Sequence, residues 1–484
     1  MASNSRQLHF IFFPQLAHGH LIPTVDMARL FAMHGVKVTI VTTPLNALLF
    51  ASKIQREKQL GFDISTLVIK FPASEVGLPE GCENVSSITS QEMIPKFLKA
   101  INLFQQPLER ILEELRPDCL VADWMFPWAT DIAGKFGIPR LVFHGTSCFA
   151  LCVVDTLIRH EPFKKISSES EPFDVPGLPD QIKMTRLQLP DYIKDTAETE
   201  RQKLIDEAIK SELTSYGVIV NSFHELEPAY TQHYSKVMRR KAWQVGPVSL
   251  CNMNNEDKAE RGNAASIDRH ECLRWLDSKK PNSVLYICFG SIFRTSAAQL
   301  NEIAKGLEAS GQDFIWVVRK VNDEDKEEWL PEGFEERMEG KGLIIRGWAA
   351  QVLILDHEAV GGFMTHCGWN STIESITAGV PMVTWPLCAE QFCNEKLVTE
   401  VLKIGVDVGA KEWCRWGDDP STKFKVMKED IERAVSRVMV GEEAEEMRSR
   451  AKELKNMARK AMEEGGSSYS DLNALLDELR LSCP

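Results

Sequence analysis

The chain has 484 residues, of which 44% are hydrophobic and 26% charged, as in ordinary globular proteins of two or three domains. Its 69 acidic residues outnumber its 56 basic ones, and the formal net charge of -13 disfavours binding to nucleic acid or to an anionic membrane surface. The 12 cysteines include no Cys-x-x-Cys pair, so we predict neither a disulfide framework nor a zinc site, and expect reduced thiols in a cytoplasmic protein. Charged residues interrupt the longest apolar stretch, 138–158, so no integral membrane segment is predicted.

Short apolar runs alternate with segments that are long enough for helices. In the first half these runs begin at Leu8, Val36, Cys119, Arg140 and Gly217, and after Pro247 they begin at Ser283, Asp313, Gly342, Ala359 and Val380. Continuous apolar strands alternating with helices predict parallel sheets that are covered on both faces. The sequence therefore predicts an α/β protein in which a doubly wound, Rossmann-like architecture occurs twice.

Changes in composition predict the domain boundaries. Residues 250–267 are polar and show no periodicity, which is typical of a linker. They separate an N-terminal domain over 1–249 from a C-terminal domain over 268–460. Charged amphipathic helices are predicted from Lys428 to the end, and the Pro-rich stretch 160–200 is predicted to be an irregular functional loop.

Two polar groups follow predicted strands in the N-terminal half. Gly19 and His20 follow the first strand, and a histidine with a pKa near ~6.5 suits a general base. The alternative is a histidine that is only satisfied at a helix N-terminus. Asp123 follows another strand, where its carboxylate would accept the imidazole N–H of His20. Asp123 would alternatively cap the next helix, a common use of this residue.

A third group lies in the C-terminal half, between residues 348 and 391. His366, Asn370 and Ser371 follow a strand and open a helix, an arrangement that suits a pyrophosphate. No Walker lysine and no G-x-G-x-x-G motif is present, which disfavours a P-loop NTPase and a dinucleotide dehydrogenase. Glu374 either forms a capping box with Ser371 or binds a ribose. Trp348 is either a core residue or a surface on which a base stacks.

Smaller signals complete the pattern. Ser291, in the run 289–291, follows a strand and would hold a phosphate or belong to a plain turn, and the next helix is expected to start near Ser296 with Gln299 as its capping partner. The acidic run 323–325 is typical of a solvated loop, and His366 with Cys367 lacks the second cluster that a metal site requires. We predict no metal site.

Residues 348–391 resemble the signature box of plant UDP-dependent glycosyltransferases of family 1. The run 17–20, Asp123 and the run 289–291 fit this resemblance, as does the length of the chain. It is most similar to the subgroup active on flavonoids, other phenolics and triterpenoids. The resemblance implies a GT-B fold of two Rossmann-like domains facing across a cleft. The N-terminal domain would bind the acceptor, the C-terminal domain the UDP-sugar, and a helix in 461–484 would cross back to the N-terminal domain.

The same resemblance implies roles for individual residues. Trp348 stacks on uracil, Gln351 lies near uracil and ribose, and Glu374 binds ribose hydroxyls. The pyrophosphate is held by His366, Asn370, Ser371 and Ser291, and Trp369, Glu390 and Gln391 face the sugar. Gly19, Ala349 and Gly368 complete the predicted donor site. Gln391 at the end of the box and Trp369 favour UDP-glucose over UDP-galactose and UDP-glucuronate.

The predicted reaction is inverting transfer of glucose to a hydroxyl of a small lipophilic metabolite. His20 removes the hydroxyl proton, Asp123 orients His20, and UDP-glucose is a substrate, so that no cofactor is required. An acceptor pocket lined by Trp124, Met125, Phe126 and Phe149 is predicted, although core packing explains the same residues. The alternatives are an epimerase-type enzyme and a protein that only binds UDP-sugar. We expect a monomer.

Overall fold

The structure is a computed structural model that describes residues 6–194, 200–292, 296–319, 329–415 and 425–482. The acidic run 323–325 lies outside these residues. Contacts divide the chain into two compact units, one formed by 1–148, 196–253 and 460–484 and the other by 149–195 and 254–459. Residues 149–195 thus group with the second unit, whereas the sequence-based boundary included them in 1–249.

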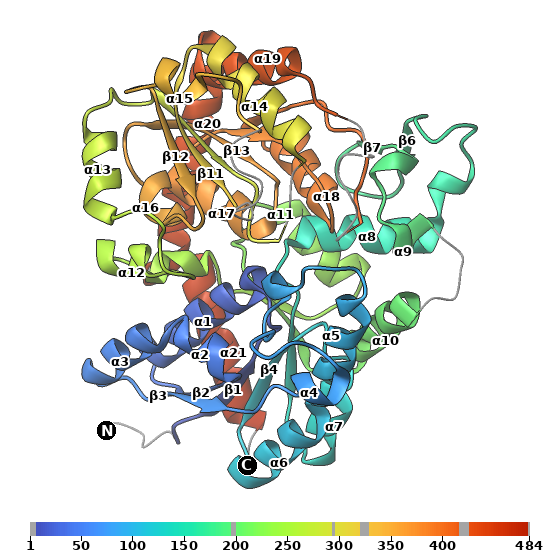
Figure 1. Cartoon of the computed structure of the whole chain (residues 1–484). Coiled ribbons are helices and arrows are strands. Elements are labelled where there is room, and N and C mark those ends of the chain that lie inside the picture. The colour runs from blue at the N-terminus through green and yellow to red at the C-terminus, as the bar shows by residue number, and fades with distance from the viewer. Residues whose placement is uncertain (1–5, 195–199, 293–295, 320–328, 416–424, 483–484) are drawn as a thin grey trace. The chain divides into compact units, whose positions relative to one another are not determined.

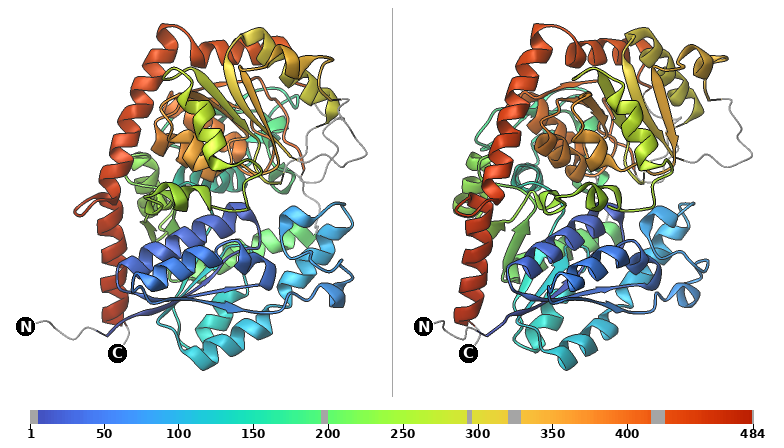
Figure 2. Two further views of the ribbon diagram at one scale, coloured as in Figure 1. Left: turned by 60° about the vertical axis from the view of Figure 1, so that its left-hand side comes forward. Right: turned by 90° about the vertical axis from the view of Figure 1, so that its left-hand side faces the viewer.

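Unit 1 contains a parallel sheet that has seven strands among the described residues, in the order β3-β2-β1-β4-β5-β8-β9. The strands are β1 (His9–Phe13), β2 (Lys37–Thr42), β3 (Ile64–Val68), β4 (Cys119–Asp123), β5 (Arg140–Phe143), β8 (Gly217–Val220) and β9 (Ala242–Gln244). Its helices are α1 (His18–Met33), α2 (Pro44–Leu48), α3 (Ala51–Gln59), α4 (Ala73–Val76), α5 (Met93–Asn102), α6 (Gln105–Leu115), α7 (Ala129–Lys135), α10 (Glu200–Thr214), α11 (Pro228–Gln232) and α21 (Ser467–Ser482). Figure 1 labels most of these elements, and Figure 2 shows helices on both faces of the sheet.

The core of unit 1 joins segments that are far apart in the sequence. Phe10 and Phe12 of β1 pack with apolar residues of α1 and with four leucines of α21, namely Leu472, Leu475, Leu476 and Leu479. These leucines recur at helical spacing and are at most 1% exposed. The amphipathic pattern near the end of the chain therefore reflects the burial of α21 in unit 1.

Unit 2 contains a second parallel sheet, with six strands in the described part of the chain, in the order β12-β11-β10-β13-β14-β15. These are β10 (Val284–Cys288), β11 (Asp313–Val318), β12 (Gly342–Arg346), β13 (Val360–Thr365), β14 (Met382–Thr384) and β15 (Gly405–Asp407). Its helices are α8 (Cys148–His160), α9 (Asp191–Lys194), α12 (Asn255–Ala259), α13 (Arg269–Asp277), α14 (Ala297–Ser310), α15 (Phe334–Arg337), α16 (Gln351–Leu355), α17 (Trp369–Ala378), α18 (Gln391–Lys396), α19 (Lys428–Met439) and α20 (Glu442–Met462). Two of these helices cross the boundary between the units: the first residue of α8 and the last residues of α20 belong to unit 1.

The prediction of two doubly wound parallel sheets is confirmed, as are all ten predicted strands. One local prediction is wrong. The stretch 160–200 is not simply irregular, because β6 (Phe173–Val175) and β7 (Ile182–Met184) form an antiparallel hairpin that buries alternate side chains. The linker also contains a helix, α12, whose N-cap Asn254 accepts a hydrogen bond from the N–H of Asp257. Among the described helices, none is both long and apolar enough to cross a membrane.

A buried carboxyl group in unit 2 makes stability depend on pH. Glu395 in α18 is 4% exposed and accepts a 3.0 Å hydrogen bond from Thr384 Oγ1. Burial raises the pKa of Glu395 from 4.5 to about 8. The folded chain therefore retains a proton that the unfolded chain releases above pH 4.5.

We expect this group to lower the free energy of unfolding as the pH rises from 4.5 to about 8, by ~1.4 kcal/mol per pH unit. Glu395→Gln cannot ionise and should lack this component. The stability difference between the variant and the parent chain should therefore increase across that window and become constant above it. Urea unfolding of both proteins at several pH values tests this, and a difference that does not change with pH would contradict it.

Candidate active site

The candidate site residues follow strands at the two places where the strand order reverses. In unit 1, β1 lies between β2 and β4, and in unit 2, β10 lies between β11 and β13. In unit 1 the chain therefore continues from β1 toward one edge of the sheet and from β4 toward the other. In unit 2 the same holds for β10 and β13. Ligands of open α/β sheets bind at such points, outside the carboxyl ends of the strands.

In unit 1, these strand ends bring His20 and Asp123 together. His20 lies in the first turn of α1, after β1, and Asp123 is the last residue of β4. Nδ1 of His20 lies 2.7 Å from Oδ2 of Asp123, whose side chain is fully buried, whereas the His20 side chain is 27% exposed. The carboxylate thus fixes the ring through Nδ1, which leaves Nε2 as the nitrogen that exchanges a proton with a substrate.

The alternative role of Asp123 as a helix cap is not realised. The next helix, α7, begins only at Ala129, and Oδ1 of Asp123 accepts the N–H of Met125 at 3.0 Å. Behind it, the buried Arg140 donates through Nη2 to the carbonyl oxygen of Asp123 at 2.8 Å. Burial lowers the pKa of Arg140 to about 10, so it still carries a positive charge near the Asp123 carboxylate at neutral pH.

A glycine after β5 makes room for the His20 ring. Gly145 has a φ of +70°, and a Cβ at this position would lie 3.3 Å from Nδ1 of His20. A side chain here would be strained by the backbone conformation and would crowd the imidazole. Gly145 therefore helps to define where the ring lies, a role that we did not predict from the sequence.

The predicted acceptor residues lie in different environments. Trp124 and Met125 are half-buried at the end of β4. Phe126 is fully buried, with its ring centroid 4.5 Å from that of Phe13, which is a core contact. Phe149 is also fully buried and belongs to unit 2. Trp124 and Met125 are thus the more accessible of the four.

In unit 2, His366 lies between two glycines. It follows β13, and the run 289–291 with the half-buried Ser291 follows the neighbouring β10. A Cβ on Gly290 would lie 2.6 Å from Nε2 of His366, and one on Gly368 would lie 2.5 Å from it. Burial lowers the pKa of His366 to about 4, so the ring is neutral at pH 7 and donates one N–H.

Helix α17 begins directly after this histidine. Gly368 is its N-cap and contributes no side-chain bond, and Trp369 is its first residue. The predicted capping box of Ser371 and Glu374 is therefore wrong, because both residues lie inside the helix. The prediction for α14 is confirmed, since Ser296 accepts the N–H of Gln299 and the helix begins at Ala297.

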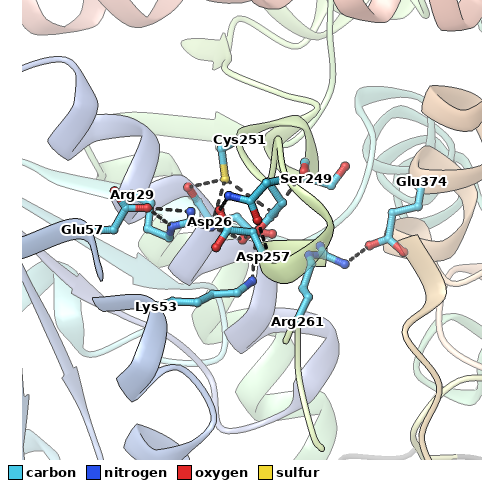
Figure 3. Close-up of polar contacts among 11 residues, drawn as sticks. Asp26, Arg29, Lys53, Glu57, Ser249, Cys251, Asp257, Arg261 and Glu374 are labelled. Atoms are coloured by element: carbon cyan, nitrogen blue, oxygen red, sulfur yellow. Dashed lines mark hydrogen bonds and ion pairs between the residues drawn. The ribbon is translucent and has the colours of Figure 1, made fainter. Parts of the chain in front are cut away.

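The Glu374 side chain is held by two partners, one of which we did not predict. Gln351, at the start of α16, donates through Nε2 to Glu374 at 2.8 Å and to Ser371 Oγ at 3.0 Å. Arg261 forms a buried ion pair with the other oxygen of Glu374, as Figure 3 shows. Arg261 lies in the predicted linker, and a single charged residue in a polar segment carries no signal that identifies its partner.

The remaining donor candidates lie around α16, α17 and α18. Trp348 donates its backbone N–H to Ser266 Oγ at 2.9 Å, and Ala349 is 7% exposed. Trp369 is 2% exposed, and Asn370 is half-buried. Gly19 lies beside His20 in α1 and thus in unit 1.

Two candidates for contact with a sugar lie at the start of α18. Oε1 of Gln391 accepts the backbone N–H groups of Leu387 and Cys388 at 2.9 and 3.0 Å. Glu390 accepts from Asn394 Nδ2 at 3.1 Å. The Gln391 side chain thus stabilises its own loop, and its amide group is 3.5 Å from Cys388 Sγ. Among the described residues, no three His, Cys, Asp or Glu side chains gather as a metal site.

Comparison with known proteins identifies relatives over nearly the whole chain. The family model of UDP-glucuronosyl and UDP-glucosyl transferases matches residues 101–412. Scopoletin glucosyltransferase of Nicotiana tabacum is 59% identical over 98% of both chains. UDP-glucose flavonoid 3-O-glucosyltransferase 7 of Fragaria ananassa is 58% identical over 98% of this chain and 96% of its own. The crystal structure of Glycyrrhiza uralensis UGT73P12 with glycyrrhetinic acid 3-O-monoglucuronide matches with a TM-score of 0.92 and 44% identity, over 98% of this chain and 96% of that chain.

Proposed function

The chain belongs to the UDP-glucuronosyl and UDP-glucosyl transferase family, and from this premise we propose that it transfers glucose from UDP-glucose to a hydroxyl of a small lipophilic plant metabolite. Its fold is the GT-B fold of such enzymes. The acceptor is a phenolic, a flavonoid or a triterpenoid, the kinds of compound that occur in the names of its relatives. The product is a β-O-glucoside.

The observation that carries the proposed mechanism is the pair formed by His20 and Asp123, 2.7 Å apart at a strand-order reversal. Nε2 of His20 takes the proton of the acceptor hydroxyl as its oxygen attacks the anomeric carbon of the sugar. Asp123 keeps Nδ1 protonated and stabilises the imidazolium that forms. UDP leaves from the opposite face of the sugar, so the configuration at the anomeric carbon inverts.

The donor is held by residues of unit 2. Trp348 stacks on uracil, and Glu374, with Gln351 beside it, binds the ribose hydroxyls. Ser291, Asn370 and Ser371 contact the pyrophosphate, and Ala349 and Gly368 approach the nucleotide through their backbone. Gly19 of unit 1 lets the backbone come close to the donor. Ser371 and Glu374 are joined by the Gln351 amide, which supports one common site.

The charge that develops on UDP is met by groups of the protein. The N-terminal amides of α17 carry partial positive charge, and the neutral His366 adds an N–H beside Gly290 and Gly368, which leave room for its ring. Because these donors do not reorganise, they stabilise the leaving group without a large cost. We therefore propose a reaction that requires no cofactor.

Glucose is the proposed sugar because the signature box ends in Gln391, which resembles glucosyl rather than galactosyl transferases, and because Trp369 provides no counter-ion for the carboxylate of a glucuronate. Rates with UDP-glucose, UDP-galactose and UDP-glucuronate test this choice, and a preference for either of the latter two would contradict it. The acceptor is tested with hydroxylated flavonoids, simple phenolics and triterpenoid aglycones, with the glucosides identified by mass spectrometry. Incubation with the donor alone separates transfer from epimerisation, and binding without any product would indicate a protein that only binds UDP-sugar.

We also propose that the enzyme acts as a monomer in the cytoplasm. The cysteines of the described residues are free, as expected of reduced thiols. Light scattering of the purified chain and imaging of a fluorescent fusion test the two statements separately.

Arg261 provides a test of the ribose site. Its side chain is 8% exposed and that of Glu374 is 2% exposed, so little water screens the pair. Arg261→Gln should let the Glu374 carboxylate leave the position that suits two ribose hydroxyls. We expect the KM for UDP-glucose to rise about tenfold, in line with the loss of one charged hydrogen bond, while the KM for the acceptor changes little.

A matched control removes an exposed arginine of the same unit. Arg346 pairs with Glu335, and both side chains are more than 40% exposed, so Arg346→Gln should leave the KM for UDP-glucose unchanged. Steady-state kinetics with varied donor measure both variants. An unchanged KM in Arg261→Gln would show that Glu374 does not need this partner.

A further inference from the structure

A second histidine–carboxylate pair lies beside the His20–Asp123 pair and has no part in the mechanism above. Nε2 of His144, the residue after β5, lies 2.6 Å from Oε2 of Glu212 in α10. β5 is the neighbour of β4 in the sheet, and Asp123 is paired with Phe143, the residue before His144. The two pairs therefore lie at the same edge of the unit 1 sheet.

The partners of Glu212 determine which nitrogen of His144 carries the proton. The other oxygen of Glu212 accepts the hydroxyl of Tyr234 at 2.9 Å and pairs with Arg240. Against the effect of burial, His144 and then Arg240 lower the pKa of Glu212 to about 2, so it is ionised at neutral pH. A carboxylate only accepts hydrogen bonds, so Nε2 of His144 carries the proton that it shares with Glu212, and in the neutral ring Nδ1 is the acceptor.

This arrangement leaves Nδ1 of His144 as a hydrogen-bond acceptor. Within the described residues, only Nε2 of this ring makes a hydrogen bond. The His144 side chain is 15% exposed. The ring of Trp124 stacks on the imidazole, with the ring centroids 6.2 Å apart and an angle of 18° between the planes. His144 and Trp124 together thus combine a flat aromatic ring with an oriented acceptor atom, Nδ1.

The chain connects this acceptor atom closely to the proposed general base. His144 directly precedes Gly145, and a Cβ added to this glycine would lie 3.3 Å from Nδ1 of His20. The backbone N–H of Trp124, the residue after Asp123, donates to the carbonyl oxygen of Phe143 at 3.0 Å. His144 and Trp124 are thus the chain neighbours of Gly145 and Asp123, the two residues that lie against the His20 ring.

We propose that His144 is a specificity-determining residue of the acceptor site, whose Nδ1 accepts a hydrogen bond from a second hydroxyl next to the one that reacts. Glu212 is the positioning residue that fixes its tautomer, and Trp124 packs against the aromatic ring of the acceptor. The preferred acceptors are then aromatic compounds with two neighbouring hydroxyl groups. This inference rests on the proposed function, since it concerns the acceptor of that reaction.

The test compares two coumarins, esculetin with two neighbouring hydroxyls and umbelliferone with one. His144→Gln keeps an amide N–H in place of Nε2 for Glu212 but lacks an acceptor atom at Nδ1, whereas His144→Asn keeps a polar atom there. We expect His144→Gln to lower kcat/KM about tenfold more for esculetin than for umbelliferone, and to change the ratio of the two esculetin monoglucosides. His144→Asn should retain more of the preference for esculetin, and the KM for UDP-glucose should be unaffected.

Each outcome decides between the possibilities. Equal losses on both coumarins, or no loss in His144→Gln, would overturn the role of His144, while glucosylation by the parent enzyme would still support the proposed function. Failure of the parent enzyme to glucosylate any acceptor of the panel would instead overturn the proposed function itself. If His144→Gln does not fold, His144→Phe, which keeps a ring against Trp124, should lose the same preference, and retention of the preference would contradict the proposal.

Discussion

Replacing His20 by alanine is expected to lower kcat on alcohol acceptors by a factor of ~10² to 10⁴, which is the usual contribution of general-base catalysis. The variant should still bind UDP, because the proposed side-chain contacts with the nucleotide belong to unit 2. Phenolic acceptors, with a pKa near ~10, ionise more easily and should lose less activity than alcohols. Single-turnover rates on an alcohol and a phenol, together with calorimetric titration of UDP, measure the three quantities.

The control for this variant is a histidine away from the site. His270 is exposed on α13, and His270→Ala should leave kcat unchanged. Asp123→Asn should also lower kcat, because the amide no longer stabilises an imidazolium at 2.7 Å. Turnover of alcohols by His20→Ala at the parent rate would contradict the assignment of His20 as the base.

The largest effect on stability is expected for Glu57→Leu. Glu57 of α3 binds Arg29 of α1 at 2.6 Å, and both side chains are at most 4% exposed (Figure 3). Arg29 also donates to Asn252 at 2.7 Å and lies 3.7 Å from a second buried carboxylate, that of Asp26. Removal of Glu57 takes away the carboxylate that binds the buried guanidinium at 2.6 Å and leaves only Asp26, at 3.7 Å, of these two carboxylates. We expect a loss of about 3 to 5 kcal/mol in the free energy of unfolding.

Two comparisons isolate this contribution. The double variant Arg29→Met/Glu57→Leu removes both charges of the pair but leaves the buried Asp26 without Arg29, so it should recover only part of the loss. Glu109→Gln breaks an exposed pair with Lys135, with side-chain exposures of 34% and 56%, and should cost less than about 1 kcal/mol. Urea unfolding followed by circular dichroism measures all three. A loss in Glu57→Leu no larger than in Glu109→Gln would contradict the expected role of the buried pair.

The fold was predictable wherever the strands are continuous apolar runs. The strands that we did not predict are short or mixed in composition. β3 has the sequence ISTLV, in which the second and third residues are polar, and β9 and β15 have three residues each. These three strands lie at the edges of their sheets, where a strand has a neighbouring strand on one side only and needs fewer apolar residues. The β6–β7 hairpin was missed because its strands are also only three residues long.

The site was predictable where a residue follows a strand, and less so where its partner comes from elsewhere. His20 and Asp123 could be paired because adjacent parallel strands end at the same edge of a sheet. Arg261 and Glu212 could not be assigned to Glu374 and His144, because each comes from a polar segment 113 or 68 positions away, where any charged residue fits equally well. Glu374 was a candidate for ribose binding, but the competing capping box could be excluded only by the start of α17.

The discontinuous make-up of unit 1 has a consequence for biosynthesis. Its sheet is complete by Gln244, yet the four leucines of α21 that complete its core are synthesised only after the whole sheet of unit 2. Domains usually fold as units during translation, but this one exposes an apolar surface until α21 has been synthesised. A truncated chain that ends before residue 460 would keep that surface exposed, and a chimera between two relatives must exchange the terminal helix together with the N-terminal half.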